Sequence, residues 1–277
     1  MTFSAPKSVS VLWALSDADQ RVGIEIAQRS AVTVATKHLE QTAAYGRRGK
    51  GGAIREPTAG LLLAKFDHHT SRDLDPQLHT HVFVFNLAPR KDGTWGAIVS
   101  RELYKAQKQA GAIYREALAV ELVRQGYAVE RTVSNFRVAA VPRRIERAFS
   151  KRREAIEAAA HEYGYRSPKG MEMAALRTRK AKRSVGRDAL FATWRSEALA
   201  MGYRLNAAIA KQHQTGRADR SGKVQFQVPS VYEREPKGSL AAATNKLAAV
   251  ARAVDQRAST PSSQVDLKQR DREKERD

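Results

Sequence analysis

Residues 66–86 read Phe66-Asp67-His68-His69-Thr70-Ser71-Arg72-Asp73-Leu74-Asp75-Pro76-Gln77-Leu78-His79-Thr80-His81-Val82-Phe83-Val84-Phe85-Asn86. His79 and His81 are two positions apart in a segment rich in β-branched and aromatic residues, so in a strand both imidazoles leave the same face. His68 precedes a polar stretch ending at Pro76, where the chain can turn and bring a second strand alongside. Such a hairpin places His68 beside the other two histidines.

Three neutral imidazoles on one sheet face are typical of a metal site with open coordination positions, which is the catalytic rather than the structural pattern. A lone His-x-His pair also occurs on ordinary strands. Cupin barrels add a nearby glutamate ligand and metallo-β-lactamase-like hydrolases add an Asp-His pair, and the residues after His81 offer neither. His69 points to the opposite face of an extended segment and is left out of the site.

Two blocks of the sequence resemble one family. The first is His68-x-Thr70-Ser71-Arg72 followed by Pro76-x-Leu78-His79-Thr80-His81, and the second is the opening run from Thr2-Phe3-Ser4-Ala5-Pro6 to Lys7-Ser8-Val9-Ser10-Val11. Both resemble the TraI/TrwC-type (MobF) conjugative relaxases, in the same order and with a long helical segment between them. The resemblance extends to about Tyr203. It implies an α/β (α+β) fold, in which helices pack on the antiparallel sheet of a histidine-metal (HUH) endonuclease.

The resemblance also implies an activity. Relaxases of this type nick one DNA strand at a plasmid transfer origin, and a tyrosine becomes linked to the 5′ end. The implied metal ligands are His68, His79 and His81, which hold one divalent ion that stabilises charge on the phosphate. The sequence does not distinguish Mn, Mg, Zn, Ni or Co, although three imidazoles suit magnesium least.

In that family the nucleophilic tyrosines and an acidic residue precede the Thr2 block, whereas this sequence starts at Met1. We therefore expect the fold to lack its first segment, and we assign no catalytic nucleophile. We also expect this chain to be inactive alone and less stable than an intact relaxase domain. Tyr104 and Tyr114 are interpreted as packing residues beside the apolar stripe of a helix.

Composition points to a polyanionic partner. The 277 residues contain 49 Lys and Arg against 29 Asp and Glu, which gives a formal charge of +20 and a pI of about 10.4. Neutralising phosphates with such cations releases counterions and favours binding. The sequence has no cysteine and no apolar run that could span a membrane, and its start lacks the features of a signal peptide. We expect a cytoplasmic protein that binds single-stranded DNA at a transfer origin, together with other relaxosome proteins.

Four cations are the candidates for DNA contact: Lys7, Arg72, Arg152 and Arg153. Lys7 and Arg72 lie within the two family blocks, and the run Phe149-Ser150-Lys151-Arg152-Arg153 also resembles the family. Each has a structural alternative. Lys7 or Arg72 pairs with Asp73 or Asp75 in that interpretation, and the arginine pair forms a solvated helix face.

The remaining patterns predict the order of the elements. Asp17 caps a helix that reaches about Ala44, and a second long helix runs from Ser100 or Arg101 to about Gln125, followed by a C-cap glycine. Residues 46–52 are expected to form a mobile basic loop, residues 58–66 a strand, and Pro142 to open a helix that continues through Ile156.

These patterns divide the chain into three parts. Residues 1–205 form the relaxase-like metal- and DNA-binding domain, 206–257 a weakly structured extension with one possible helix, and 258–277 a disordered charged tail. The alternative function is a non-catalytic single-stranded DNA-binding protein in which the metal is structural.

Overall fold

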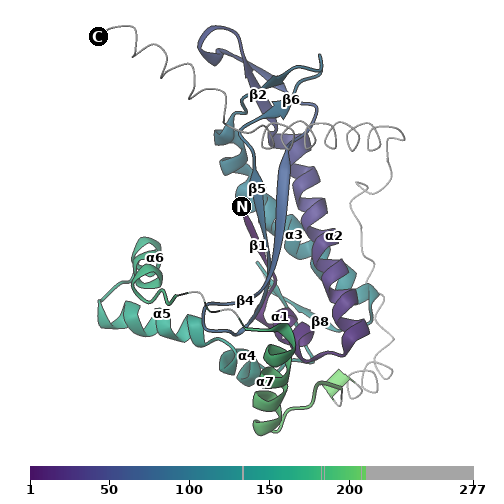
Figure 1. The fold of residues 1–277 in the computed structure, drawn as a ribbon, viewed down its shortest axis with the longest axis vertical. Helices are drawn as coiled ribbons and strands as arrows, with labels where there is room; N and C mark the ends of the chain where they lie inside the picture. Colours follow the sequence, from purple (N-terminus) through teal and green to yellow (C-terminus); the bar gives the residue numbers. More distant parts are fainter. Residues whose placement is uncertain (133, 182, 184, 207, 210–277) are drawn as a thin grey trace, which may run out of the picture. The chain divides into compact units, whose positions relative to one another are not determined.

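The computed structural model describes residues 1–132, 134–181, 183, 185–206 and 208–209, all of which lie in one compact unit, Met1–Arg220. Its centre is an antiparallel sheet of β1 (Thr2–Ser4), β4 (Leu63–Thr70) and β5 (Pro76–Val84) in the order β1-β5-β4. The α/β fold with an antiparallel sheet is confirmed (Figure 1). The strand expected over residues 58–66 begins only at Leu63 and extends to Thr70.

Three helices lie against this sheet: α1 (Lys7–Leu15), α2 (Ala18–Ala43) and α3 (Ser100–Arg124). The backbone N–H of Gln20 donates to the Asp17 side chain at 2.9 Å, and Gln20 bonds back to the Asp17 backbone, so the predicted N-cap of α2 is confirmed. Gly126 has φ +87° after α3, the left-handed conformation expected of a C-cap glycine. Figure 1 shows α2 and α3 running along the length of the sheet.

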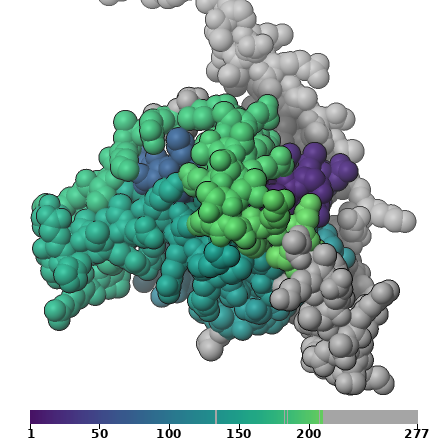
Figure 2. Space-filling model, turned by 90° about the horizontal axis from the view of Figure 1, so that it is seen from below, coloured from purple at the N-terminus to yellow at the C-terminus, as the bar shows by residue number. Residues whose placement is uncertain are grey.

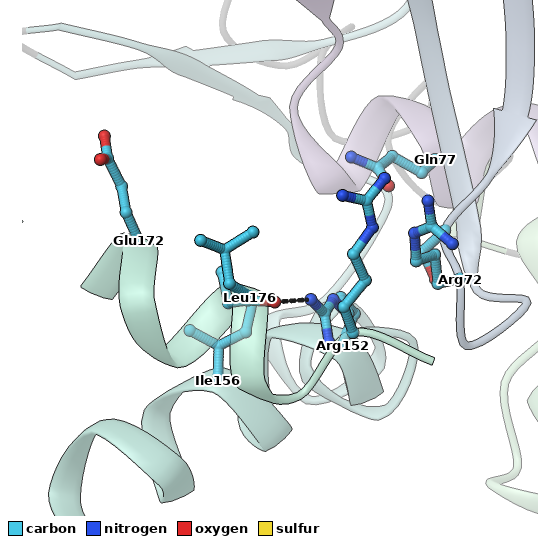
Figure 3. Close-up of a pocket in the computed structure, with 9 residues that line it drawn as sticks. Arg72, Gln77, Arg152, Ile156, Glu172 and Leu176 are labelled. Atoms are coloured by element: carbon cyan, nitrogen blue, oxygen red, sulfur yellow. Dashed lines mark hydrogen bonds between the residues drawn. The ribbon is translucent and has the colours of Figure 1, made fainter. Parts of the chain in front are cut away.

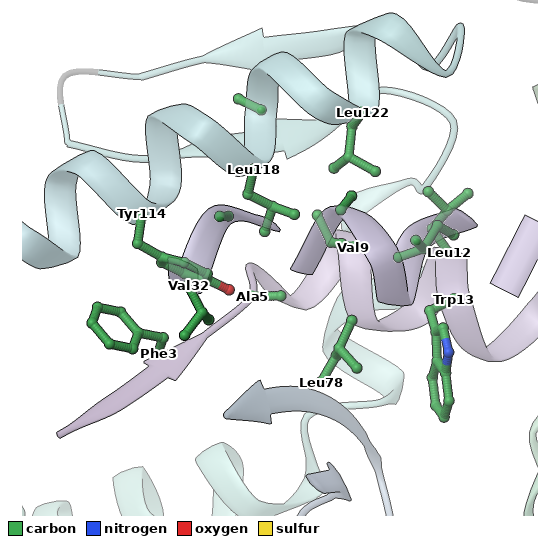
Figure 4. Close-up of a cluster of buried hydrophobic side chains, with 14 of the residues drawn as sticks. Phe3, Ala5, Val9, Leu12, Trp13, Val32, Leu78, Tyr114, Leu118 and Leu122 are labelled. Atoms are coloured by element: carbon green, nitrogen blue, oxygen red, sulfur yellow. The ribbon is translucent and has the colours of Figure 1, made fainter. Parts of the chain in front are cut away.

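The core lies between the sheet and these helices (Figure 4). Phe3 and Leu78 project from β1 and β5 into it, and α3 contributes Tyr114 and Leu118. Burial of such side chains removes apolar surface from water and stabilises the arrangement. The outer face of the sheet is left uncovered by these three helices.

One buried polar network crosses the core without leaving donors unpaired. Gln28 of α2 donates to the Phe3 carbonyl at 3.3 Å and to Thr80 Oγ1 at 3.2 Å. Its own Oε1 accepts from the Tyr114 hydroxyl at 2.6 Å. The network therefore links β1, β5, α2 and α3 at one point. Tyr114 is buried as predicted, but Tyr104 is 74% exposed, so the interpretation of Tyr104 as a packing residue was wrong.

Short hairpins surround the central sheet. Their strands are β2 (Tyr45–Arg48) with β3 (Ile54–Pro57), β6 (Ala88–Pro89) with β7 (Trp95–Gly96), and β8 (Val129–Arg131) with β9 (Phe136–Val138). The 3₁₀ turn η1 (Lys50–Gly52) joins β2 to β3. The expected mobile basic loop is thus a hairpin: Arg48 pairs with Asp92 and, at 3.6 Å, with Glu56. Sequence alone did not reveal Asp92 as a partner because it is 44 residues away along the chain.

Four shorter helices follow: α4 (Arg143–Ala148), α5 (Lys151–Glu162), α6 (Pro168–Arg177) and α7 (Arg187–Ala200). The prediction of a single helix from Pro142 through Ile156 was wrong, because the helix is interrupted at Phe149 and Ser150. Phe149 is fully buried, and the Ser150 hydroxyl donates to the Glu146 carbonyl at 2.6 Å, which ends α4. No helix among the described residues is long and apolar enough to cross a membrane. The predicted extension and charged tail lie outside the described residues, except at 206, 208 and 209.

Candidate metal centre and nucleic-acid interface

Three histidines meet on the outer face of the sheet. His68 of β4 lies directly opposite His79 of β5, and His81 lies opposite Phe66 on one side and Thr2 on the other. The ring centroids are 5.4 Å apart for His68 and His79, 5.2 Å for His68 and His81, and 5.0 Å for His79 and His81. The predicted hairpin therefore brings these three rings together, as the alternation of a strand requires.

Two of the rings are oriented by hydrogen bonds behind them. His79 Nδ1 lies 2.8 Å from the Gln77 carbonyl, which can only accept, so this nitrogen carries the proton and Nε2 keeps its lone pair. His81 Nδ1 lies 2.8 Å from Thr2 Oγ1. Burial lowers the pKa of His79, and the adjacent His81 and His68 lower it further. The pKa of His81 is also lowered, by desolvation and then by His68. Both effects favour the neutral imidazole that binds metals.

The donor set fits a transition-metal ion. Nitrogens each about 2.1 Å from one ion would leave their ring centroids about 5 Å apart, which is the spacing of these rings. Within the described part of the chain, however, no three His, Cys, Asp or Glu side chains are already arranged as a group that could hold a metal. Rotation of the side chains on a fixed backbone register would be needed to aim the three nitrogens at one point.

His69 lies on the other side of the sheet, against α1. Its ring stacks on Trp13 at a centroid distance of 5.0 Å, and its Nε2 is 3.9 Å from Glu25. Burial and the nearby Arg187 lower its pKa. Arg187 of α7 pairs with Glu25, so α7 is held against α1 and α2 here. Figure 2 shows the green surface of α7 next to the purple surface of the N-terminal residues.

The turn between β4 and β5 is fixed by its own polar groups. Ser71 Oγ accepts the backbone N–H of Asp73 at 3.2 Å and of Asp75 at 3.1 Å. Leu74 has φ +62°, a conformation that is uncommon for a residue other than glycine. Trp194 of α7 donates its indole N–H to the Leu74 carbonyl at 2.8 Å. These contacts set the direction in which β5, and therefore His79, leaves the turn.

Lys7 is placed beneath this turn rather than on an open surface. Its ammonium donates to the Pro76 carbonyl at 2.9 Å. Burial lowers the pKa of Lys7, while Asp75 and Glu146 raise it. Burial likewise raises the pKa of Asp75, which is 1% exposed and accepts the Arg152 backbone N–H at 3.3 Å. The structure thus gives Lys7 a role in holding β5 through the Pro76 carbonyl, whereas the structural alternative named Asp73 or Asp75 as its partner.

Arg152 closes the end of α6. Its guanidinium donates to the carbonyls of Thr178 and Ala175, both at 2.6 Å, and to Thr178 Oγ1 at 3.0 Å. These are carbonyls that the helix itself leaves unpaired. Arg72 donates to the Lys180 carbonyl at 3.0 Å. Both arginines still line an open pocket of about 580 Å³, whose other walls include Gln77 and Arg179 (Figure 3).

Arg153 faces solvent on α5. Its side chain is 69% exposed and pairs with Glu157 one turn along the helix. Of the four cations proposed to contact DNA, Arg153 is the exposed one, whereas Lys7, Arg72 and Arg152 are partly buried. The DNA-contact role of all four stays a prediction.

Two described tyrosines are buried and hydrogen-bonded, which makes them poor nucleophiles. Tyr114 is buried, which raises its pKa, and it donates to Gln28. Burial raises the pKa of Tyr203 to about 12, and its hydroxyl donates to the Ala140 carbonyl at 2.8 Å. A phenol with a raised pKa is rarely ionised near neutral pH, so neither is an activated nucleophile.

Sequence reasoning missed the residues that support the histidines. Thr2 and Gln77 lie inside the two recognised blocks, so their position was the available signal. Ser71 also lies inside a recognised block, whereas Trp194 gave a weaker signal, because its partner is a turn backbone atom 120 residues away along the chain. Sequence reasoning also missed Phe66 and Phe83, which are exposed on the same sheet face as the three histidines.

Comparison with known proteins gives concordant matches. The TrwC relaxase family model matches residues 1–201. The multifunctional conjugation protein TraI of Escherichia coli (strain K12) is 34% identical over 216 residues, which are 75% of this chain and 12% of that protein. A second TraI from Escherichia coli is 35% identical over 216 residues. The chain thus spans 12% of the length of the curated relatives it matches.

Solved structures of the conjugative relaxase TrwC in complex with oriT DNA are similar in fold. The metal-bound complex has a TM-score of 0.68 and 36% identity, covering 74% of this chain and 71% of that one. The metal-free complex has the same TM-score and identity and covers 73% of its chain. A complex of TrwC with a 27-mer DNA comprising the recognition hairpin and the cleavage site has a TM-score of 0.67.

Proposed function

The chain belongs to the TrwC relaxase family, and from this premise we propose that it acts as a relaxase domain on single-stranded DNA at a plasmid transfer origin. The observation that carries the proposal is the group of His68, His79 and His81 on the outer face of the sheet. The similarity to TrwC structures solved with oriT DNA supports the same substrate for this chain. Such a protein would work in the cytoplasm, together with other relaxosome proteins.

We assign His68, His79 and His81 as the residues that would hold one divalent ion. When bound, the ion would stabilise negative charge on a phosphate oxygen. Gln77 and Thr2 orient two of the rings from behind. Lowered pKa values keep His79 and His81 in the neutral, ligating form. Manganese, zinc, nickel and cobalt suit three imidazoles better than magnesium does.

We assign no nucleophilic tyrosine among the described residues. The expected property of this chain is therefore binding of metal and single-stranded DNA, without formation of a tyrosyl-DNA link by the chain alone. A relaxase also needs to hold the DNA backbone. The proposed contacts are Lys7, Arg72, Arg152 and Arg153. Arg72 and Arg152 lie at a pocket that Gln77 also lines.

Calorimetric titration of the full chain with Mn²⁺, Zn²⁺, Ni²⁺, Co²⁺ and Mg²⁺ tests the metal assignment. We expect one ion per chain and a loss of metal affinity in His79→Ala. The matched control is His161→Ala, which removes an exposed histidine of α5. Equal metal binding by His79→Ala and the unmodified chain would contradict the ligand set.

A second measurement separates the two candidate functions. Fluorescence anisotropy with a labelled single-stranded oligonucleotide reports DNA binding, and a denaturing gel reports cleavage or a covalent adduct. Folded His79→Ala that still binds DNA would show that metal and DNA binding are separable. Loss of folding in His79→Ala would instead favour the DNA-binding protein with a structural metal. Absence of single-stranded DNA binding by the unmodified chain would refute the proposal.

A further inference from the structure

We propose that Phe66, Phe83 and Phe85 form a stacking platform for unpaired DNA bases next to the three histidines. The inference rests on the proposed function, and it adds residues that would hold the bases rather than the phosphates. It concerns one occupant, a single-stranded DNA segment that crosses the outer face of the sheet.

The register of the sheet places these aromatic rings beside the histidines. Phe66 lies opposite His81, and Phe83 lies opposite Ala64, two positions further along β5 than His81. Because side chains alternate between the two faces of a strand, Phe66 and Phe83 share the face of His68, His79 and His81. Phe85 follows β5, and its ring meets that of Phe83 edge-on at a centroid distance of 4.9 Å. The histidines and phenylalanines thus share one face of the β4–β5 hairpin.

The exposure of these rings indicates a binding surface. Phe66 is 56% exposed, Phe83 57% and Phe85 39%. Phe3 of the same sheet, by contrast, points inward and is 4% exposed. A group of large exposed apolar side chains on a folded surface usually marks a binding site. Phenylalanine rings on a sheet offer a flat partner that every base can stack on, whatever its sequence.

The absence of carboxylates on this face suits a polyanionic strand as the stacking ligand. The alternation and register place nine residues on it: Thr2, Ser4, Ala64, Phe66, His68, Gln77, His79, His81 and Phe83. None of these nine is acidic. Asp67, the nearest carboxylate along β4, belongs to the opposite face, where Arg29 and Thr80 donate to it. A DNA strand therefore meets no carboxylate among these nine residues, and it presents both base faces for the rings and phosphates for the basic chain.

The platform also explains how a strand could be aligned over the histidines. Its rings begin at the cross-strand neighbour of His81 and continue away from the β4–β5 turn. The arginines at the pocket lie at the turn end of the hairpin. Bases stacked on the phenylalanines would therefore hold the strand on one side of the histidines, and cations would hold its backbone on the other.

The test uses the full chain and the double variant Phe66→Ala/Phe83→Ala. We expect its affinity for a fluorescein-labelled oligo(dT) to fall roughly 5- to 100-fold for each base that stacks. Tyr104→Ala is the matched control, because Tyr104 is an aromatic residue that is 74% exposed on α3. Phe83→Trp, which keeps a stacking ring, should retain binding. Metal affinity of the double variant should equal that of the unmodified chain.

A spectroscopic readout identifies stacking itself. An oligonucleotide with 2-aminopurine at successive positions should show quenching on binding to the unmodified chain, confined to a few neighbouring positions and lost in the double variant. Replacing those positions with abasic sites should weaken binding by the unmodified chain and leave the double variant unaffected.

The outcomes separate the platform from the proposed function. If the unmodified chain binds single-stranded DNA and the double variant binds it equally well, the platform is refuted and the relaxase proposal stands. If the double variant loses thermal stability and DNA affinity together and Phe83→Trp also fails to retain DNA affinity, the rings pack against protein and the platform is also refuted. If the unmodified chain binds no single-stranded DNA, both proposals fail.

Discussion

Tyr203 illustrates how the fold changes the properties of a single side chain. Its hydroxyl donates to the Ala140 carbonyl at 2.8 Å, and burial raises its pKa to about 12. The unfolded chain ionises the same phenol at about pH 10. Between pH 10 and pH 12 the folded protein therefore holds more protons than the unfolded one, and stability falls as pH rises.

The variant Tyr203→Phe tests this linkage. At pH 8 we expect it to be less stable than the unmodified chain by about 1 kcal/mol, because the Ala140 carbonyl loses its partner. At pH 11 ionisation favours the unfolded state of the unmodified chain alone, by about 1.4 kcal/mol, so the difference should vanish or reverse. Urea unfolding at both pH values measures it. An unchanged difference would mean that the phenol of the folded protein is not shielded.

At the scale of single elements, two helices have an end that is capped by a specific side chain. One capping residue is local in sequence and the other comes from a different helix. The N-terminus of α2 is capped by Asp17, three residues from its partner Gln20. The C-terminus of α6 is capped by Arg152, which comes from α5 and reaches the carbonyls of Ala175 and Thr178. Both devices satisfy backbone groups that a helix leaves unpaired.

Replacing Asp17 by alanine should cost about 1 kcal/mol of stability, because the N–H of Gln20 loses its acceptor. Asp19→Ala is the control, since it removes a negative charge from the first turn without removing the cap, and it should cost about 0.3 kcal/mol. Thermal unfolding followed by circular dichroism compares the two. Equal losses would show that charge near the helix end matters, and not the cap.

Arg152→Lys should loosen α6 while the charge is kept. A lysine ammonium cannot bridge the three oxygen atoms that the planar guanidinium contacts. We expect roughly tenfold faster amide exchange in Pro168–Arg177, equivalent to about 1.4 kcal/mol of local stability. Arg153→Lys, at the neighbouring exposed position, should leave that exchange unchanged. Weaker DNA binding by Arg152→Lys with unaltered exchange would assign Arg152 to DNA contact rather than to the helix end.

At the scale of the whole molecule, the histidine face couples a ligand to the stability of the sheet. His68 belongs to β4, His79 and His81 belong to β5, and Thr2 of β1 bonds to His81. An ion held by the three histidines would therefore link β4 to β5 directly, and it would be connected to β1 through the bond between Thr2 and His81. Any ligand that binds only the folded state raises the free energy of unfolding by mass action.

A divalent metal at 100 times its dissociation constant should add about 2.7 kcal/mol to the stability of the unmodified chain. His79→Ala should show no such gain, whereas His161→Ala should retain it. Differential scanning fluorimetry with and without the metal, and again after chelation, provides the comparison. A gain of the same size in His79→Ala would place the stabilising ion elsewhere.

The sequence by itself determined the features that depend on residues close together along the chain. The two-residue spacing of His79 and His81 places both rings on one face, and the turn before Pro76 returns His68 to them. Asp17 and Gly126 mark helix ends because capping involves residues within one helical turn. The family resemblance likewise rests on two short blocks and fixed the fold class.

The tertiary structure alone decided which partners each charged or aromatic residue has. Lys7, Arg72 and Arg152 contact backbone carbonyls that are 69, 108 and 23 to 26 residues away. Tyr104 and Tyr114 lie on one helix, yet one faces solvent and the other bonds to Gln28, 86 residues distant. The outward row of phenylalanines likewise became evident only once β4 and β5 were paired in register. A local pattern fixes the direction of a side chain relative to its own strand or helix, but what it meets there depends on which distant segments pack against it.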